Sequence, residues 1–170
     1  MRILAYDLVG ESAYVNAVDI IRKDLECLHD DDYAFDMAVN EAVLNAAQYS
    51  VDGAEKAKIH IEFHVTDYDV VTKVSSKTKH FDMFAHRNQL LAMVLRPDFK
   101  SVDWTDYVAD SDRLGRGIWY MLSGSDYIYM DRYAQYVCLC ASNPCNKDAK
   151  TSNMRDLLMR FFVVKDGVLL

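Results

Sequence analysis

The chain has few features that would tie it to nucleic acid or to a membrane. No stripe of lysine or arginine is present, and the formal charge is −7 with an isoelectric point near 5.1. Nucleic-acid binding draws on clustered basic side chains, so the sequence argues against nucleic acid as the main partner. Apolar runs are short and interrupted by charges, and residues 1–7 lack the apolar length and cleavage site of a signal peptide. We therefore expect a cytoplasmic protein that makes no membrane contact.

Cysteine is scarce and irregularly spaced, at Cys27, Cys138, Cys140 and Cys145. Such spacing gives no disulfide framework, and it matches no structural zinc pattern, which favours reduced thiols on a strand in a reducing compartment. With 170 residues, of which 51% are apolar and 26% charged, the chain is long enough to bury a core of its own. Because no internal repeat or low-complexity linker appears, we expect a single domain.

Residues 58–66 show the clearest pattern in the chain. Apolar side chains alternate there with His60, Glu62 and His64, which is typical of a half-buried strand. The turn at 67–69 then predicts a hairpin whose second strand spans 70–75. His60, Glu62 and His64 share one strand face and contain zinc-ligating atoms. A solvated strand face explains them more simply than a metal site does.

Other elements follow from periodicity and capping residues. Further strands are expected at 2–8, 127–132 and 136–141. Helices are expected after Ser12, at 33–49, from Gly117 to about Ser123, and after Thr151 or Ser152. Residues 77–112 form a loop-rich segment with one amphipathic piece at 88–95, and the Asp166-Gly167 pair predicts a small terminal hairpin within 163–170.

Glu41 and Asn45 are four residues apart on the expected helix at 33–49 and so project from the same side. A carboxylate and a carboxamide in this arrangement can hold Mg²⁺ together with water, because Mg²⁺ prefers oxygen ligands. An ordinary amphipathic helix is the alternative, since this spacing is common.

Gly115 and Gly117 flank Arg116 just before the helix expected at 117–123. Glycine adopts backbone conformations that let consecutive N–H groups point at an anion, and phosphate binds readily at helix N-termini. The alternative is a tight loop followed by a buried helix.

Together, Asn40–Ala47 and Leu114–Met121 resemble the N-box and second glycine box of the GHKL (Bergerat-fold) ATPases, most closely the bacterial anti-sigma-factor serine kinases. The resemblance implies an α+β fold: a two-layer α/β sandwich of the histidine-kinase-like ATPase type, with a mixed, mostly antiparallel sheet and helices on one face. It also implies ATP and Mg²⁺ as cofactors. Glu41 would be the general base, Asn45 the Mg²⁺ ligand, and Gly115, Arg116 and Gly117 the phosphate cradle.

The sequence departs from that family where adenine would bind. The resemblance predicts an Asp-x-Gly-x-Gly box, but Ser76 stands in place of the aspartate, and Thr78 and His80 replace the glycines. Ser76 could still accept a hydrogen bond, although a charged acceptor makes a stronger one. The late Gly-Thr pair of the family reads Ala134-Gln135, and Tyr49 stands in place of the N-box histidine.

Two functional hypotheses follow from these residues. The first is a regulatory protein that resembles the anti-sigma-factor kinases, binds a sigma factor or an antagonist of the STAS type, and uses Mg-ATP to phosphorylate serine. The second is a nonenzymatic interaction module with a decayed nucleotide pocket. A third interpretation is an unrelated α+β domain, which predicts that Glu41 and Asn45 lie far from Gly115 and Gly117. We expect the domain core to span about 1–142, with an extension at 143–170 that could seal the pocket, form a homodimer or hold a partner.

Overall fold

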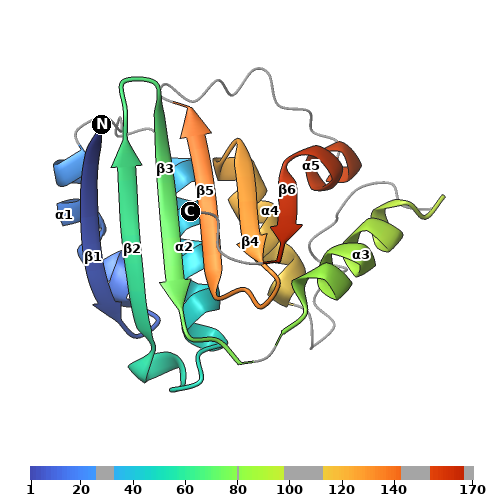
Figure 1. The fold of residues 1–170 in the computed structure, drawn as a ribbon, viewed down its shortest axis with the longest axis horizontal. Coiled ribbons are helices and arrows are strands. Elements are labelled where there is room, and N and C mark those ends of the chain that lie inside the picture. The colour runs from blue at the N-terminus through green and yellow to red at the C-terminus, as the bar shows by residue number, and fades with distance from the viewer. Residues whose placement is uncertain (26–32, 80, 98–112, 143–153, 167–170) are drawn as a thin grey trace.

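The computed structural model describes residues 1–25, 33–79, 81–97, 113–142 and 154–166. The strands within this part of the chain are β1 Arg2–Val9, β2 Lys58–Val65, β3 Asp69–Ser76, β4 Tyr127–Asp131, β5 Tyr136–Ser142 and β6 Phe162–Lys165. The helices are α1 Ala13–Leu25, α2 Tyr33–Gln48, α3 Met83–Val94, α4 Arg113–Gly124, α5 Met154–Arg160 and the short 3-10 helix η1 Ala54–Lys56. Helices and strands thus alternate along most of the chain, as the periodicity predicts (Figure 1).

The six strands form one sheet in the order β1-β2-β3-β5-β4-β6. Neighbouring strands are antiparallel except for β4 and β6, which run parallel. One row of paired residues crosses the whole sheet and points to the same face: Tyr6, Ile61, Val74, Val137, Met130 and Val164. Four of the five apolar members of this row are at most 5% exposed, so the row forms the floor of the core. The prediction of a mixed, mostly antiparallel sheet is confirmed.

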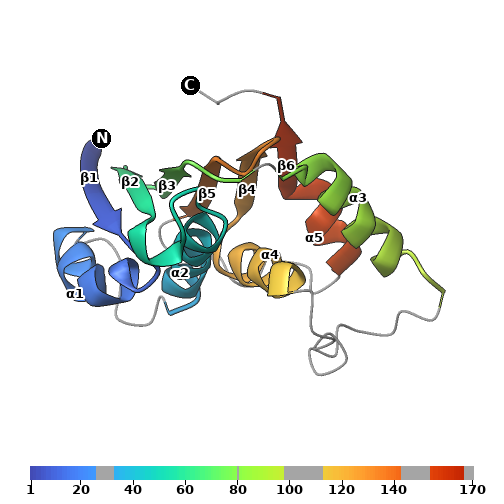
Figure 2. The same ribbon diagram turned by 90° about the horizontal axis from the view of Figure 1, so that it is seen from below.

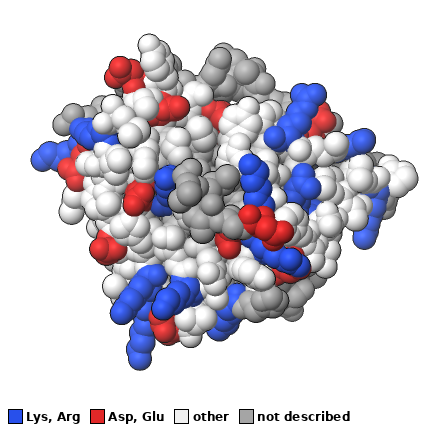
Figure 3. Space-filling model, viewed as in Figure 1, with Lys and Arg blue, Asp and Glu red and all other residues white. Residues whose placement is uncertain are grey.

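Helices cover one face of this sheet. Seen from below, α1, α2 and α4 lie side by side under the strands, while α3 and α5 pack at the β6 end (Figure 2). On the opposite face of the sheet, acidic and basic side chains of the described residues are intermixed (Figure 3). The architecture is therefore a two-layer α/β arrangement with an open sheet.

Helices α2 and α4 approach each other unusually closely at Gly124. A Cβ atom at Gly124 would lie 1.9 Å from the carbonyl oxygen of Ala34 and 2.8 Å from Ala38 Cβ, distances that no real side chain tolerates. Gly117 lies two turns earlier on α4 and faces α2 as well. Glycines on one side of α4 thus set how near the two helices can pack.

Two helices begin earlier than the sequence predicts. Helix α4 begins at Arg113, four residues before the predicted start at Gly117. The amphipathic piece at 88–95 is the second half of α3, which begins after Asp82; the Asp82 carboxylate caps it by accepting from the backbone N–H groups of Phe84 and Ala85. Local glycine and turn signals failed at these places because packing and capping determined the helix starts.

The predicted terminal hairpin stays a prediction, because its second strand would lie in residues 167–170, outside the described part of the chain. β6 pairs in parallel with β4, while Gly167 lies outside the described residues. The predicted caps Thr151 and Ser152 also lie outside them. The extension belongs to the same core, since Leu158 and Phe162 are fully buried. The Arg87 guanidinium of α3 donates to the carbonyls of Phe162 at 2.9 Å and Leu158 at 3.1 Å, which ties α3 to α5 and β6.

Candidate functional site

Helix α2 brings Glu41 and Asn45 to the same side, one turn apart, and α4 places Gly117 directly against them. A Cβ atom built on Gly117 would lie 2.9 Å from Asn45 Nδ2 and 3.4 Å from Glu41 Oε2. Residues more than seventy positions apart therefore converge, as the resemblance predicts. The separation that the third interpretation predicts is not observed for Gly117, while the relation to the family stays a prediction.

The expected phosphate loop takes a different form. Because α4 starts at Arg113, Gly115 and Arg116 lie in its first turn, and Gly117 is already inside the helix. Among the described glycines, only Gly10 and Gly53 have a positive φ. Helical backbone therefore stands where the resemblance predicts a glycine loop. Position 117 requires a glycine because the backbone there packs closely against the Asn45 side chain. Phosphate contact by Gly115, Arg116 and Gly117 stays a prediction.

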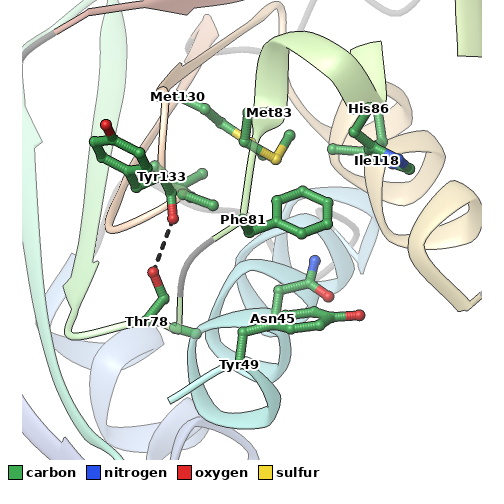
Figure 4. Close-up of a pocket in the computed structure, with 12 residues that line it drawn as sticks. Asn45, Tyr49, Thr78, Phe81, Met83, His86, Ile118, Met130 and Tyr133 are labelled. Atoms are coloured by element: carbon green, nitrogen blue, oxygen red, sulfur yellow. Dashed lines mark hydrogen bonds between the residues drawn. The ribbon is translucent and has the colours of Figure 1, made fainter. Parts of the chain in front are cut away.

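A small cavity lies beside Asn45, between α2, the start of α3, α4 and the β4–β5 turn (Figure 4). Its lining is mostly apolar and consists of Asn45, Ala46, Tyr49, Thr78, Phe81, Met83, His86, Ile118, Met130, Tyr133, Ala134 and Val137. The cavity volume is about 30 Å³. A space of that size holds a water molecule or two, whereas small-molecule sites usually occupy roughly 300–1,000 Å³.

Aromatic side chains fill the space next to Asn45. The Phe81 ring centroid lies 5.8 Å from that of Tyr49 and 5.4 Å from that of His86, and Figure 4 shows Phe81 pointing toward Tyr49 and Asn45. Such centroid distances are typical of packed aromatic pairs. Sequence reasoning missed Phe81 and His86; the only signal was the Phe-Asp pair that precedes α3.

The strand end at Ser76 and Thr78 is committed to internal hydrogen bonds. The Thr78 hydroxyl donates to the Tyr133 carbonyl at 2.8 Å, and Thr78 is only 5% exposed. The Ser76 hydroxyl donates to the Ala46 carbonyl at 3.4 Å, and Ser76 does not line the cavity. Thr78 therefore occupies space that a glycine would leave empty. His80, the other residue at a glycine position, lies outside the described residues.

The backbone of Ala134 adopts a left-handed conformation. Ala134 is the non-glycine residue with a positive φ among those described, at 53°, and it lines the cavity. This left-handed conformation favours glycine, because it brings a Cβ atom close to the backbone. The resemblance places a glycine at position 134, and the backbone there has the conformation that favours glycine although the residue is an alanine.

An ion pair fixes the segment that carries Phe81. Asp82 caps α3 and pairs with Arg132 at 3.4 Å. The backbone N–H of Ala85 and the nearby guanidinium of Arg132 lower the pKa of the Asp82 carboxyl. Arg132 also lies 5.9 Å above the Phe84 ring. The capped helix start and this pair hold Phe81 next to the cavity.

The open sheet face carries the residues that could suggest zinc. His60 lies 2.8 Å from Asp7 and 3.3 Å from Glu62, and His64 lies 3.0 Å from Glu62. The bond to Asp7 raises the pKa of His60, and the bond to His64 lowers the pKa of Glu62. Among the described residues, no group of three or more His, Cys, Asp or Glu side chains is arranged to hold a metal ion.

The residues present fit Mg-ATP only in part. Glu41 and Asn45 supply the oxygen atoms that Mg²⁺ prefers, but the cavity beside them has no room for a purine while Phe81 and Thr78 keep their positions. Ser76 also cannot provide the carboxylate that the resemblance calls for. We therefore derive no catalytic step through ATP.

In comparisons with known proteins, no family model matches the chain and no curated protein matches its sequence. Within the part of the chain that the structure describes, no helix is both long and apolar enough to span a membrane.

Proposed function

We propose that this chain is a regulatory domain that resembles the anti-sigma-factor kinases and acts by binding a partner protein, a sigma factor or a STAS-type antagonist. In this proposal the domain is a nonenzymatic interaction module, and its nucleotide pocket is closed. The observation that carries the proposal is the packing of Phe81 between Tyr49 and His86 beside Asn45.

The convergence of Glu41, Asn45 and Gly117 supports the resemblance on which the choice of partner depends. The hydrogen bond from Thr78 to the Tyr133 carbonyl supports the proposed loss of nucleotide binding. Opening the cavity would require Phe81 to leave its aromatic neighbours and this hydrogen bond to be rearranged. Both changes cost free energy that nucleotide binding would have to supply.

A second candidate is a serine kinase that uses Mg-ATP, with Glu41 as the general base and Asn45 as the Mg²⁺ ligand. The short approach of Gly117 to both side chains favours it, because the oxygen ligands and the start of α4 lie together. This candidate requires Phe81 to swing out of the cavity.

The partner-binding test measures the affinity of the purified chain for each sigma factor and STAS-type protein of the same organism, with and without Mg-ATP. We expect one of these proteins to bind, with an affinity that neither Mg-ATP nor Asn45→Ala changes. A STAS protein that becomes phosphorylated on serine by the wild type but not by Glu41→Gln would overturn the nonenzymatic proposal and establish the kinase.

A further inference from the structure

A second hollow lies between α1 and α2, on the opposite side of α2 from the Asn45 cavity. Its lining residues are Tyr14, Val15, Val18, Asp19, Arg22, Asp36, Met37 and Asn40, none of which lines that cavity. At about 100° per residue, the three from α2 point half a turn away from Asn45, Ala46 and Tyr49. The volume of this α1–α2 groove is about 430 Å³, within the range of roughly 300–1,000 Å³ usual for small-molecule sites.

A buried polar network forms one wall of the α1–α2 groove. The Tyr14 hydroxyl donates to Asp36 Oδ1 at 3.3 Å, and the Arg22 guanidinium donates to and pairs with Asp36 Oδ2. Asp36 is 8% exposed and Tyr14 only 1%. These contacts fix the side chains that form this wall, which is what a preformed site requires.

Asn40 lines the same groove and has an unused acceptor, which is turned away from solvent. Its side-chain oxygen Oδ1 is buried and has no hydrogen-bond partner among the described residues. Buried acceptors without a donor are rare in folded proteins, because they lose their bonds to water without replacement. A turn of the side-chain amide about its last rotatable bond would bring this oxygen to the groove, where a ligand with N–H or O–H groups could donate to it.

The charge and the shape of the α1–α2 groove restrict which ligands would fit it. The groove contains two carboxylates, Asp19 and Asp36, against one cation, Arg22, so it carries a surplus negative charge. Apolar walls come from Val18, Met37 and Val15, and Val15 is 58% exposed. A ligand with an aliphatic stem and a positively charged donor head matches both features.

We propose that the α1–α2 groove binds an alkyl cation with N–H donors, the chemistry of agmatine or of an arginine side chain. The Asn40 amide turns so that Oδ1 accepts from the cationic head, and Asp19 faces its charge. The carboxylate of Asp36 stays paired with Arg22, and the aliphatic stem lies against Val15, Val18 and Met37. This proposal does not depend on the proposed function, because it uses none of the residues around Asn45.

The first test is calorimetric titration of the full chain with agmatine, a blocked arginine amide and pentanoate, an anion with a similar stem. We expect saturable binding of at least one cation and none of pentanoate. Agmatine binding alone assigns the site to a free small cation, whereas equal binding of the blocked arginine assigns it to an arginine side chain of a protein. Binding of pentanoate as tight as that of the cations, or no cation binding at millimolar concentration, overturns the proposal.

Variants of Asn40 then test the assigned contact. Asn40→Leu keeps the side-chain shape but removes the acceptor, so we expect cation affinity to fall about tenfold or more. Asn40→Asp adds a charge and should raise that affinity. The matched control is Asn16→Leu, on an exposed part of α1 outside the groove, which should bind as the wild type does.

Thermal unfolding without ligand separates binding from folding. Since Asn40 Oδ1 has no partner, Asn40→Leu should unfold at or above the wild-type temperature while it binds the cation poorly. A folded Asn40→Leu variant with wild-type affinity would overturn the role of Asn40. Wild-type affinity in Asn40→Asp would do the same.

Discussion

Helix α2 has a hollow on each of two opposite sides, and the two differ in volume and in how closely the surrounding side chains pack. The Asn45 cavity is small, apolar and filled by aromatic rings, with a volume of about 30 Å³. The α1–α2 groove is about 430 Å³, and its lining combines apolar side chains with the Asp36 network and Asn40. The motifs most visible in the sequence thus lie at the closed hollow, while the open one lies beside residues that form no motif.

The two sides of α2 differ in how tightly the neighbouring helix packs against them. On the cavity side, α2 contacts α4 closely enough that two glycines of α4 face it. On the groove side, α2 and α1 leave space between them and join through the Asp36 network. Substitutions on the two sides should therefore have very different effects on the free energy of unfolding.

The largest expected effect is at the α2–α4 contact. Gly124→Ala would place a Cβ atom against the Ala34 carbonyl oxygen, which is backbone and cannot rotate away. We expect the free energy of unfolding to fall by about 3 kcal/mol, measured by urea denaturation. Val15→Ala, on the groove side and 58% exposed, should change it by less than about 0.5 kcal/mol. Equal losses in the free energy of unfolding of the two variants would contradict the difference in packing between the two sides of α2.

Phe81→Ala tests whether the aromatic ring is what closes the cavity. Loss of the half-buried ring should lower the free energy of unfolding by about 2 kcal/mol and enlarge the cavity. The variant should then gain thermal stability on addition of indole, while the wild type should not. The matched control is Phe84→Ala, which removes a ring that lies outside the cavity. Indole stabilisation of the control variant as well would show that the cavity is not its binding site.

Ala134→Gly should be stabilising. Ala134 has a φ of 53°, and a left-handed conformation costs an alanine about 1–2 kcal/mol, which outweighs the extra flexibility of glycine in the unfolded chain. We expect a gain of up to about 1 kcal/mol in chemical denaturation. A loss of similar size would mean that the alanine methyl group packs usefully against the cavity.

The smallest effect concerns the groove wall and appears only at high pH. Burial, and then the charge of Asp36, raise the pKa of the Tyr14 hydroxyl well above its ordinary value of 10.0. The unfolded chain therefore loses this proton first, so the contribution of Tyr14 to stability is complete below pH 10 and declines above it. Tyr14→Phe should flatten the fall in unfolding temperature above pH 10. An unchanged alkaline slope would show that Tyr14 titrates normally.

Local patterns were sufficient for the elements whose neighbours are close in sequence. Strict alternation placed β2 and β3 within one residue of their observed bounds, because a half-buried hairpin imposes that pattern by itself. Helix α2, predicted at 33–49, spans Tyr33–Gln48. The spacing of Glu41 and Asn45 on it was likewise a local property.

Features that depend on distant neighbours were not predictable. Gly115 and Gly117 indicate a loop locally, yet both are helical, and Gly117 packs against α2. The terminal segment joins β4 in parallel, a pairing that no turn signal announces. Phe81 meets Tyr49 only because the chain returns to α2 after the β2–β3 hairpin. The α1–α2 groove could not be predicted for the same reason, since Asp36 and Arg22 belong to different helices.

The measurement that most directly tests the closed cavity is calorimetric titration of the wild-type chain with Mg-ATP, beside Asn45→Ala. The account predicts no saturable heat with either protein up to millimolar nucleotide, while circular dichroism shows both to be folded. Saturable, Mg²⁺-dependent binding to the wild type that Asn45→Ala abolishes would contradict it. Phe81 would then be a movable side chain over a working nucleotide site.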